Sequence, residues 1–195
     1  MAASLASHGV ATAVMDYRLA PDVNLTEIVR EVRAAVALLW HSGETYGIDR
    51  NQIYVGGSSA GGHLTGTVLA GGWHKEFDVP ENVVKGGMLF SGLFHLAPIA
   101  KCFVQDWIAL TDDEVSRLSP ALNLPRQGPP VTLIYGDREP AGFARQSKEF
   151  HRLWQIAGFK STLIEVDNRN HFDVVHELAQ PDSDVTNRLI RMMGV

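Results

Sequence analysis

The five residues from Gly57 to Gly61 read Gly-Ser-Ser-Ala-Gly, which matches the pattern G-x-S-x-G. A β-type run precedes them and a helical pattern follows, the context in which this pattern forms a sharp strand-to-helix turn. Such a turn projects the central hydroxyl, that of Ser59, beyond the strand end. It also aims the backbone N–H of Ala60 at a developing oxyanion. We therefore predict Ser59 as a nucleophile and Ala60 as an oxyanion donor, the alternative being a Gly/Ser-rich turn without catalytic meaning.

A serine nucleophile needs a general base. Three of the eight histidines follow the run at 131–136, which is the fourth strand that the sequence predicts. His171 lies in a polar loop after the fifth predicted strand, at 161–166. From this loop its side chain can reach across the strand ends to Ser59. His151 lies inside a predicted helix and His176 in a helical-looking stretch. We therefore predict His171 as the base. His176 also begins the zinc motif H-E-x-x-H, but Gln180 occupies its second histidine position, so the motif is incomplete.

The acid that orients the base has two candidates at the end of the fourth strand. Asp137 directly follows the strand-ending Gly136 and is the obvious choice by residue type. In hydrolases built from alternating strands and helices, however, the acid commonly stands three residues after that glycine and before a proline. Glu139, followed by Pro140, fits this pattern, so we predict Glu139 as the acid. Asp137 is the alternative, or else a turn residue or an exposed partner of Arg138.

The elements that must carry these residues alternate between strand and helix patterns. Short apolar runs predict strands at 11–17, 52–56, 84–91, 131–136 and 161–166. Apolar residues at three- and four-residue steps predict helices from Leu25 to before Gly43, after Ser59, at 143–157 and at 182–193, and residues 2–8 look like the end of another. The alternation predicts an α/β fold with a mostly parallel sheet and helices on both faces.

The length of 195 residues suits one domain, and no repeat or linker divides it. Residues 93–130 break the strand–helix rhythm and predict a small helical excursion over the strand ends. His63 stands four residues after Ser59, and we assign it no catalytic role.

Composition narrows the classes of partner. Seventeen Lys and Arg against 22 Asp and Glu, a net charge of −5, with no basic run, argue against nucleic acid. The single cysteine, Cys102, excludes an internal disulfide framework and is expected to pack in the core. No apolar run approaches membrane-spanning length, and no Lys or Arg precedes Arg18. We therefore expect a cytoplasmic protein that is not associated with membranes.

Several longer segments resemble one family. They are DYRLAP at 16–21, SAGGHL at 59–64, SGLFHLAP at 91–98, FARQS at 143–147 and HFD at 171–173. With these segments the chain resembles, over nearly its whole length, the kynurenine formamidase (arylformamidase) branch of the α/β-hydrolase superfamily. That branch is related to the hormone-sensitive-lipase-like esterases, which share the first two segments.

The resemblance implies an activity and a set of site residues. The family hydrolyses N-formyl-L-kynurenine to L-kynurenine and formate, in tryptophan breakdown, without a metal or other cofactor. Ser59 matches its nucleophile, His171 its base and Glu139 its acid, where the animal enzymes have Asp. An aryl substrate needs an apolar slot, for which Phe94, His95 and Trp107 are candidates, with core packing as the alternative for each. The implied partner is a small N-formyl arylamine or ester, and a homodimer is left open.

The resemblance also implies missing parts. The family takes a second oxyanion N–H from an H-G-G motif, and none precedes Ser59. The three N-terminal strands also have no counterpart, and the third normally lies between the strands predicted at 11–17 and 52–56. We expect a fragment of a longer enzyme, the alternatives being a strand supplied by another chain or a decayed homologue. A broad carboxylesterase is the other enzymatic hypothesis, and a non-catalytic binding module is the hypothesis from a different class.

Overall fold

The computed structural model describes residues 2–195 and is built around a four-stranded sheet in the order β1-β2-β3-β4. Every neighbouring pair of strands is parallel. The strands are β1 (Ile53–Ser58), β2 (Val84–Phe90), β3 (Val131–Gly136) and β4 (Ser161–Val166). The predicted parallel sheet is thus confirmed, and all four strands lie where apolar runs predicted them.

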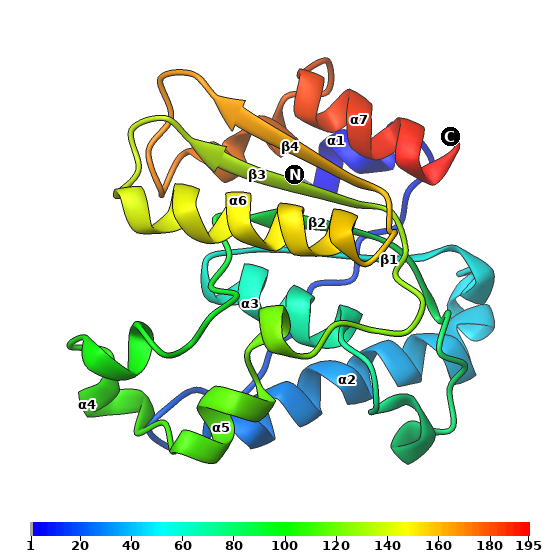
Figure 1. Ribbon diagram of the computed structural model, residues 1–195. Helices are drawn as coiled ribbons and strands as arrows, with labels where there is room; N and C mark the ends of the chain where they lie inside the picture. The colour runs from blue at the N-terminus through cyan, green and yellow to red at the C-terminus, as the bar shows by residue number, and fades with distance from the viewer. Residues whose placement is uncertain (1) are drawn as a thin grey trace.

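Helices cover both faces of this sheet (Figure 1). One face carries α2 (Leu25–Ser42), α3 (Ala60–Leu69) and α6 (Ala141–Ile156), and the other carries α1 (Ala2–Ala6) and α7 (Asp184–Met193). Short 3-10 helices span Gly43–Tyr46, Arg50–Gln52, His74–Phe77, Ile99–Lys101, Pro120–Leu122 and Val174–Ala179. The arrangement is the α/β fold that the alternating pattern predicted.

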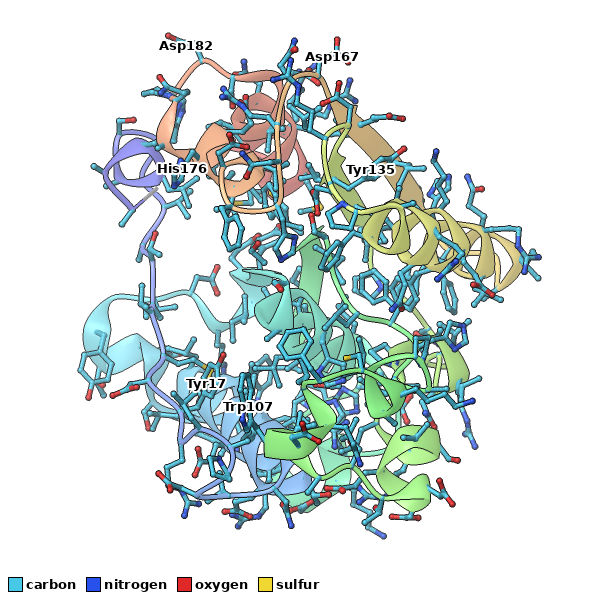
Figure 2. All side chains as sticks on the ribbon, turned by 90° about the vertical axis from the view of Figure 1, so that its left-hand side faces the viewer. Tyr17, Trp107, Tyr135, Asp167, His176 and Asp182 are labelled. Atoms are coloured by element: carbon cyan, nitrogen blue, oxygen red, sulfur yellow. The ribbon has the colours of Figure 1, made fainter. Side chains whose placement is uncertain are left out.

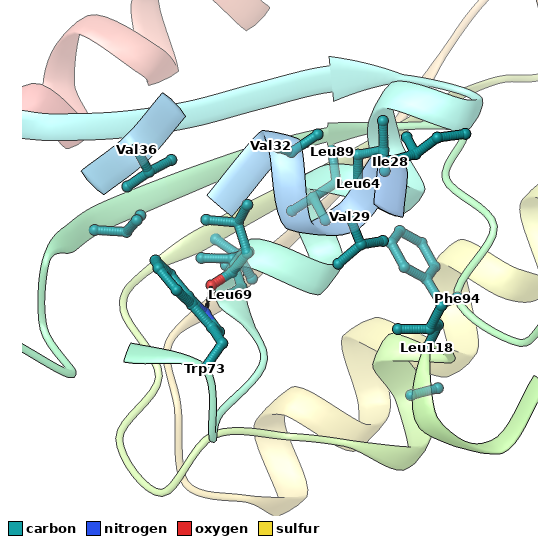
Figure 3. Close-up of a cluster of buried hydrophobic side chains, with 14 of the residues drawn as sticks. Ile28, Val29, Val32, Val36, Leu64, Leu69, Trp73, Leu89, Phe94 and Leu118 are labelled. Atoms are coloured by element: carbon teal, nitrogen blue, oxygen red, sulfur yellow. Dashed lines mark hydrogen bonds between the residues drawn. The ribbon is translucent and has the colours of Figure 1, made fainter. Parts of the chain in front are cut away.

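The core consists of two apolar clusters, one on each face of the sheet. Successive side chains of a strand point to opposite faces. Leu133 of β3 therefore belongs to the larger cluster and its neighbour Ile134 to the smaller one, and both are 0% exposed. The larger cluster, part of which Figure 3 draws, joins α2 and α3 to the sheet. Because both faces of β2 and β3 are buried, these strands are rigid supports for whatever follows their carboxyl ends.

Helix α2 follows from the sequence in detail. Its buried residues recur at helical spacing, which turns one apolar stripe toward the larger cluster: Leu25, Ile28, Val29, Val32, Val36 and Ala37. Asn24 caps its N-terminus by accepting a 2.9 Å hydrogen bond from the backbone N–H of Glu27. The helix ends at Ser42, immediately before Gly43, as predicted.

Residues 93–130 form two short helices, α4 (Gln105–Ile108) and α5 (Asp112–Arg117), among loops. A capping box between Thr111 and Glu114 begins α5. The carboxylate of Glu114 also accepts hydrogen bonds from the backbone N–H and hydroxyl of Thr26, at 3.2 and 2.8 Å. These bonds tie the segment to the first turn of α2.

The strand predicted at 11–17 is wrong. The segment has no regular secondary structure, and Val14 within it is 87% exposed. A cleft of about 1120 Å³ lies among this segment, α2, α3 and β1. The apolar run is compatible with a strand, but a strand also needs a neighbouring backbone to pair with. Within residues 2–195 this segment pairs with no strand, and β1 pairs only with β2.

The prediction for Cys102 is also wrong. Its side chain is exposed and donates a 3.2 Å hydrogen bond to the carbonyl oxygen of Ile99, within the same turn. Cysteine is often buried, but here the residue directly follows the 3-10 helix Ile99–Lys101, in a loop that packs no side chain over it.

Candidate active site

Ser59 lies on the turn between β1 and α3, where the backbone is sharply bent. Its φ of 57° and ψ of −115° fall in a region that residues with a side chain rarely adopt. Its backbone N–H donates a 2.9 Å hydrogen bond to the carbonyl oxygen of Phe90, which holds the bend against β2. A Cβ at Gly57 would lie 2.4 Å from the carbonyl oxygen of Gly61, so only glycine fits there. The G-x-S-x-G spacing therefore has a steric cause.

Three side chains from separate loops meet beyond the strand ends. His171, from the loop after β4, places Nε2 2.9 Å from the Oγ of Ser59. Its Nδ1 lies 2.8 Å from Oε2 of Glu139, which follows β3. Because the sheet is parallel, the carboxyl ends of these strands lie at one edge. Residues far apart in the chain are thereby joined in one line of hydrogen bonds.

The carboxyl group of Glu139 is fully enclosed, with a side-chain exposure of 0%. Its Oε1 accepts hydrogen bonds from the backbone N–H of Gly136, at 2.6 Å, and from the hydroxyl of Ser91, at 2.5 Å. Asp137 is exposed, and its Oδ1 accepts a 3.2 Å hydrogen bond from the backbone N–H of Arg169. Of the two candidate acids, Glu139 is therefore the one beside the imidazole, and Asp137 braces a turn.

The hydrogen-bond partners define the tautomer of His171. An ionised Glu139 can only accept hydrogen bonds, so Nδ1 carries the proton. Nε2 then has a free lone pair directed at the hydroxyl of Ser59. This is the arrangement in which an imidazole can remove a proton from a serine as the hydroxyl attacks a carbonyl carbon.

Comparison with known proteins shows what the chain is similar to. A family model described as BD-FAE matches residues 1–86. Kynurenine formamidases from Salmo salar and Danio rerio are 29% and 26% identical to the chain, each covering 100% of it, while the chain covers 66% of each relative. Over its whole length the chain is thus similar to kynurenine formamidases. It spans just under two thirds of the length of these relatives.

A solved structure agrees on the fold of the chain. An esterase from Pyrobaculum calidifontis superposes with a TM-score of 0.80 and covers 99% of the chain at 17% identity, and the chain covers 69% of it. At this identity the likeness concerns the architecture. The predicted α/β-hydrolase fold class is confirmed.

Two aromatic rings, which the sequence analysis placed in family-like segments without a site role, flank the imidazole. Phe143, in the first turn of α6, stacks on His171 with ring centroids 4.0 Å apart and an interplanar angle of 24°. Phe172 meets the same ring edge-on at 5.6 Å and is 83% exposed. Phe143 stands four residues after Glu139, a spacing that could have drawn attention to it.

Ala60 is the first residue of α3 and is exposed. The first turn of a helix supplies no acceptor for its own N–H groups, so the amide of Ala60 is free to donate to a substrate oxygen. The positive end of the α3 dipole lies at the same place and favours negative charge there. This is the position that we predicted for an oxyanion donor.

The candidate substrate contacts are placed differently from our expectation. Phe94 is 0% exposed and stacks on Phe150 at 4.2 Å in the larger core cluster, so it is a core residue rather than the lining of an open slot. The ring of His95 is partly exposed, and its Nε2 lies 3.6 Å from the carboxylate of Glu149. Gln146 of α6 holds the backbone of both residues, since its Oε1 accepts hydrogen bonds from the N–H groups of Phe94 and His95, at 2.7 and 2.6 Å.

Trp107 is 58% exposed on α4 and meets Phe103 edge-on at 5.7 Å, so core packing does not describe it. Figure 2 shows it in the lower half of the molecule, whereas His176, in the 3-10 helix Val174–Ala179 that follows His171, lies in the upper half. The helical excursion thus leaves this ring on the surface.

His63 is buried and lies outside the line of hydrogen bonds. Its Nε2 lies 2.8 Å from the carbonyl oxygen of Leu118, which ties α3 to the 93–130 segment. Burial, with the nearby positive charge of Arg33, lowers the pKa of His63 to about 4. The imidazole is therefore neutral near pH 7 and serves as a hydrogen-bond donor.

Two further features are absent from residues 2–195. In this range, no group of three or more His, Cys, Asp or Glu side chains is arranged to hold a metal ion. None of the helices there is long and apolar enough to cross a membrane.

Proposed function

We propose that the protein is a serine hydrolase of the arylformamidase type, which cleaves N-formyl-L-kynurenine to L-kynurenine and formate. The observation that carries this proposal is the line from Ser59 through His171 to Glu139, with donor–acceptor distances of 2.9 and 2.8 Å. The kinship with kynurenine formamidases supports the choice of substrate.

The geometry suits a two-step displacement. The Oγ of Ser59 attacks the formyl carbon while Nε2 of His171 takes the hydroxyl proton. The backbone N–H of Ala60 stabilises the oxyanion. When the C–N bond breaks, His171 passes the proton to the departing arylamine, and formyl-Ser59 remains. Water, activated by the same imidazole, then releases formate and restores the serine.

The aromatic surroundings of His171 favour an aryl leaving group. The leaving nitrogen must come within hydrogen-bonding distance of Nε2 to receive the proton. An aryl ring attached to that nitrogen then lies close to Phe143 and Phe172, which contact the imidazole at centroid distances of 4.0 and 5.6 Å. Aromatic pairs at such distances attract each other in stacked and edge-to-face arrangements.

The first test removes the nucleophile. Ser59→Ala should lower kcat/KM for N-formyl-L-kynurenine by about 10⁴- to 10⁶-fold, because within residues 2–195 no other hydroxyl forms a hydrogen bond with His171. Steady-state kinetics of the protein and the variant measure this loss, and circular dichroism of both checks the fold. An unchanged rate in the variant would remove Ser59 from the mechanism.

The second candidate function is that of a carboxylesterase with broad specificity. The same hydroxyl and imidazole can attack an ester carbonyl, and Phe172, at 83% exposure, leaves the surroundings of His171 open on one side. Specificity constants for N-formyl-L-kynurenine and p-nitrophenyl acetate separate the two functions. We expect the formamide to be preferred, and a large preference for the acetate would favour the esterase.

The non-catalytic alternative is tested without a substrate. A fluorophosphonate probe labels a serine only where a base activates it. We expect it to label Ser59 in the 195-residue chain and not in Ser59→Ala. Absence of labelling in a folded chain would favour a binding module.

A further inference from the structure

Ser91 directly follows β2 and lies beneath the candidate site. It is 0% exposed, and its φ of 46° falls in the left-handed region. Its backbone N–H donates a 2.8 Å hydrogen bond to the carbonyl oxygen of Ile134, which fixes the residue between β2 and β3. Its hydroxyl donates a 2.5 Å hydrogen bond to Oε1 of Glu139.

The backbone at Ser91 would suit a glycine better. A left-handed φ is strained for a residue with a Cβ and unstrained for glycine. Packing around the Cβ of Ser91 does not explain why this fully buried side chain carries a hydroxyl. The hydroxyl donates to Glu139, so the site retains a strained side chain whose polar atom contacts the candidate acid.

The contacts of Glu139 show what this hydrogen bond does. A glutamate has three side-chain torsions, one more than aspartate, and so needs more restraint to aim its carboxylate. Two donors fix Oε1, the N–H of Gly136 at 2.6 Å and the hydroxyl of Ser91 at 2.5 Å. With Oε1 fixed from two directions, Oε2 is left to meet Nδ1 of His171 at 2.8 Å. Removal of the Ser91 hydroxyl leaves Oε1 with a single donor, the N–H of Gly136, so the carboxylate is less firmly oriented.

We propose that Ser91 is a positioning residue, which through its hydroxyl holds Glu139 in the orientation that directs the imidazole of His171 at Ser59. The proposal rests on the proposed function of the Ser59 site. Ser91 touches no reacting atom and acts only through the carboxylate.

Two variants separate the hydroxyl from the backbone strain. Ser91→Ala removes the hydroxyl and keeps the strained Cβ, whereas Ser91→Gly removes both, so a loss that the two variants share belongs to the hydroxyl. In both, the rate of fluorophosphonate labelling of Ser59 and kcat should fall by about 10- to 100-fold with KM unchanged, as expected for loss of a hydrogen bond to a charged group. A normal rate in Ser91→Gly would overturn the proposal.

A matched control and a double variant exclude a merely structural effect. Ser147 of α6 is also 0% exposed, and within residues 2–195 its hydroxyl has no hydrogen-bond partner, so Ser147→Ala should keep the parent rates. If Ser91 acts through the carboxylate, Ser91→Gly should cause little further loss once Glu139→Gln is present. A full additional loss in that background would contradict the proposal.

A spectroscopic measurement tests the positioning independently of the reaction. The proton on Nδ1 of His171, which is shared with Glu139, should give a low-field ¹H NMR signal that shifts or broadens in Ser91→Gly and not in Ser147→Ala. If the parent protein neither labels nor turns over substrate, the proposed function fails, and this signal still decides whether Ser91 positions the pair. An unchanged signal in Ser91→Gly overturns the inference.

Discussion

The carboxyl ends of the strands and the outer side of β1 are two places where distant segments of the chain approach each other. At the strand ends, each atom in the line from Ser59 to Glu139 has a partner within 2.9 Å. On the outer side of β1, residues 11–17 face the strand across a cleft of about 1120 Å³ and form no ladder with it. The first region is determined by the parallel pairing of β1 to β4, which brings their carboxyl ends to one edge of the sheet. The second shows that an apolar run alone does not make a strand.

The prediction with the largest expected effect in this comparison concerns Glu139, the candidate acid at the strand ends. Glu139→Gln should lower kcat by about 10³- to 10⁴-fold, because the glutamine amide can donate to Nδ1 of His171 and so favours the wrong tautomer. Asp137→Asn is the matched control. Its side-chain oxygen still accepts from the N–H of Arg169, so the rate should change less than about threefold. Kinetics on one substrate for both variants measure the contrast, and the reverse order would make Asp137 the acid.

A second prediction compares stability in the two regions. Leu133 is 0% exposed in the larger cluster, and Leu133→Ala should lower the free energy of unfolding by about 2–5 kcal/mol. Val14 is 87% exposed, so Val14→Ala should change it by less than about 0.5 kcal/mol. Urea denaturation of the three proteins measures both effects. A loss above 2 kcal/mol in Val14→Ala would mean that residues 11–17 are packed in solution.

The strands and the candidate triad were predictable because their signals are local. β3 is a fully buried six-residue run and β4 a partly exposed edge strand of the same length, and a polar loop after each carries Glu139 or His171. The stack of Phe143 on His171 and the bond from Ser91 to Glu139 were not predictable. They depend on how β2, β3 and α6 are placed relative to one another, which no single segment encodes.

The errors have the same origin. Phe94 and Trp107 are both aromatic residues of the 93–130 segment, yet one is fully buried and the other is 58% exposed. Their residue type gave no reason to separate them. The separation comes from the turn after β2, which brings Phe94 against Phe150 of α6, and from the surface position of α4.

A further prediction, on the pH dependence of stability, concerns His63, which joins the buried α3 to the excursion. Its pKa is about 4 in the folded protein, against an ordinary value of 6.5. Between these values the unfolded chain binds a proton that the folded chain does not, so stability falls as the pH falls from 6.5 toward 4. At about 1.4 kcal/mol per pH unit the loss approaches 3 kcal/mol by pH 4.

Glutamine in place of His63 isolates this effect, because its amide can still donate to the carbonyl oxygen of Leu118 but does not titrate. The free energy of unfolding, measured in urea at pH 7, 5 and 4, should decline less steeply in His63→Gln than in the parent protein. Carboxylates titrate in both proteins, so the difference between the two declines belongs to His63. Parallel declines would mean that His63 binds a proton in the folded chain as readily as in the unfolded chain. The core beside α3 would then be as open to solvent as the cleft beside β1, and the two would differ only in shape.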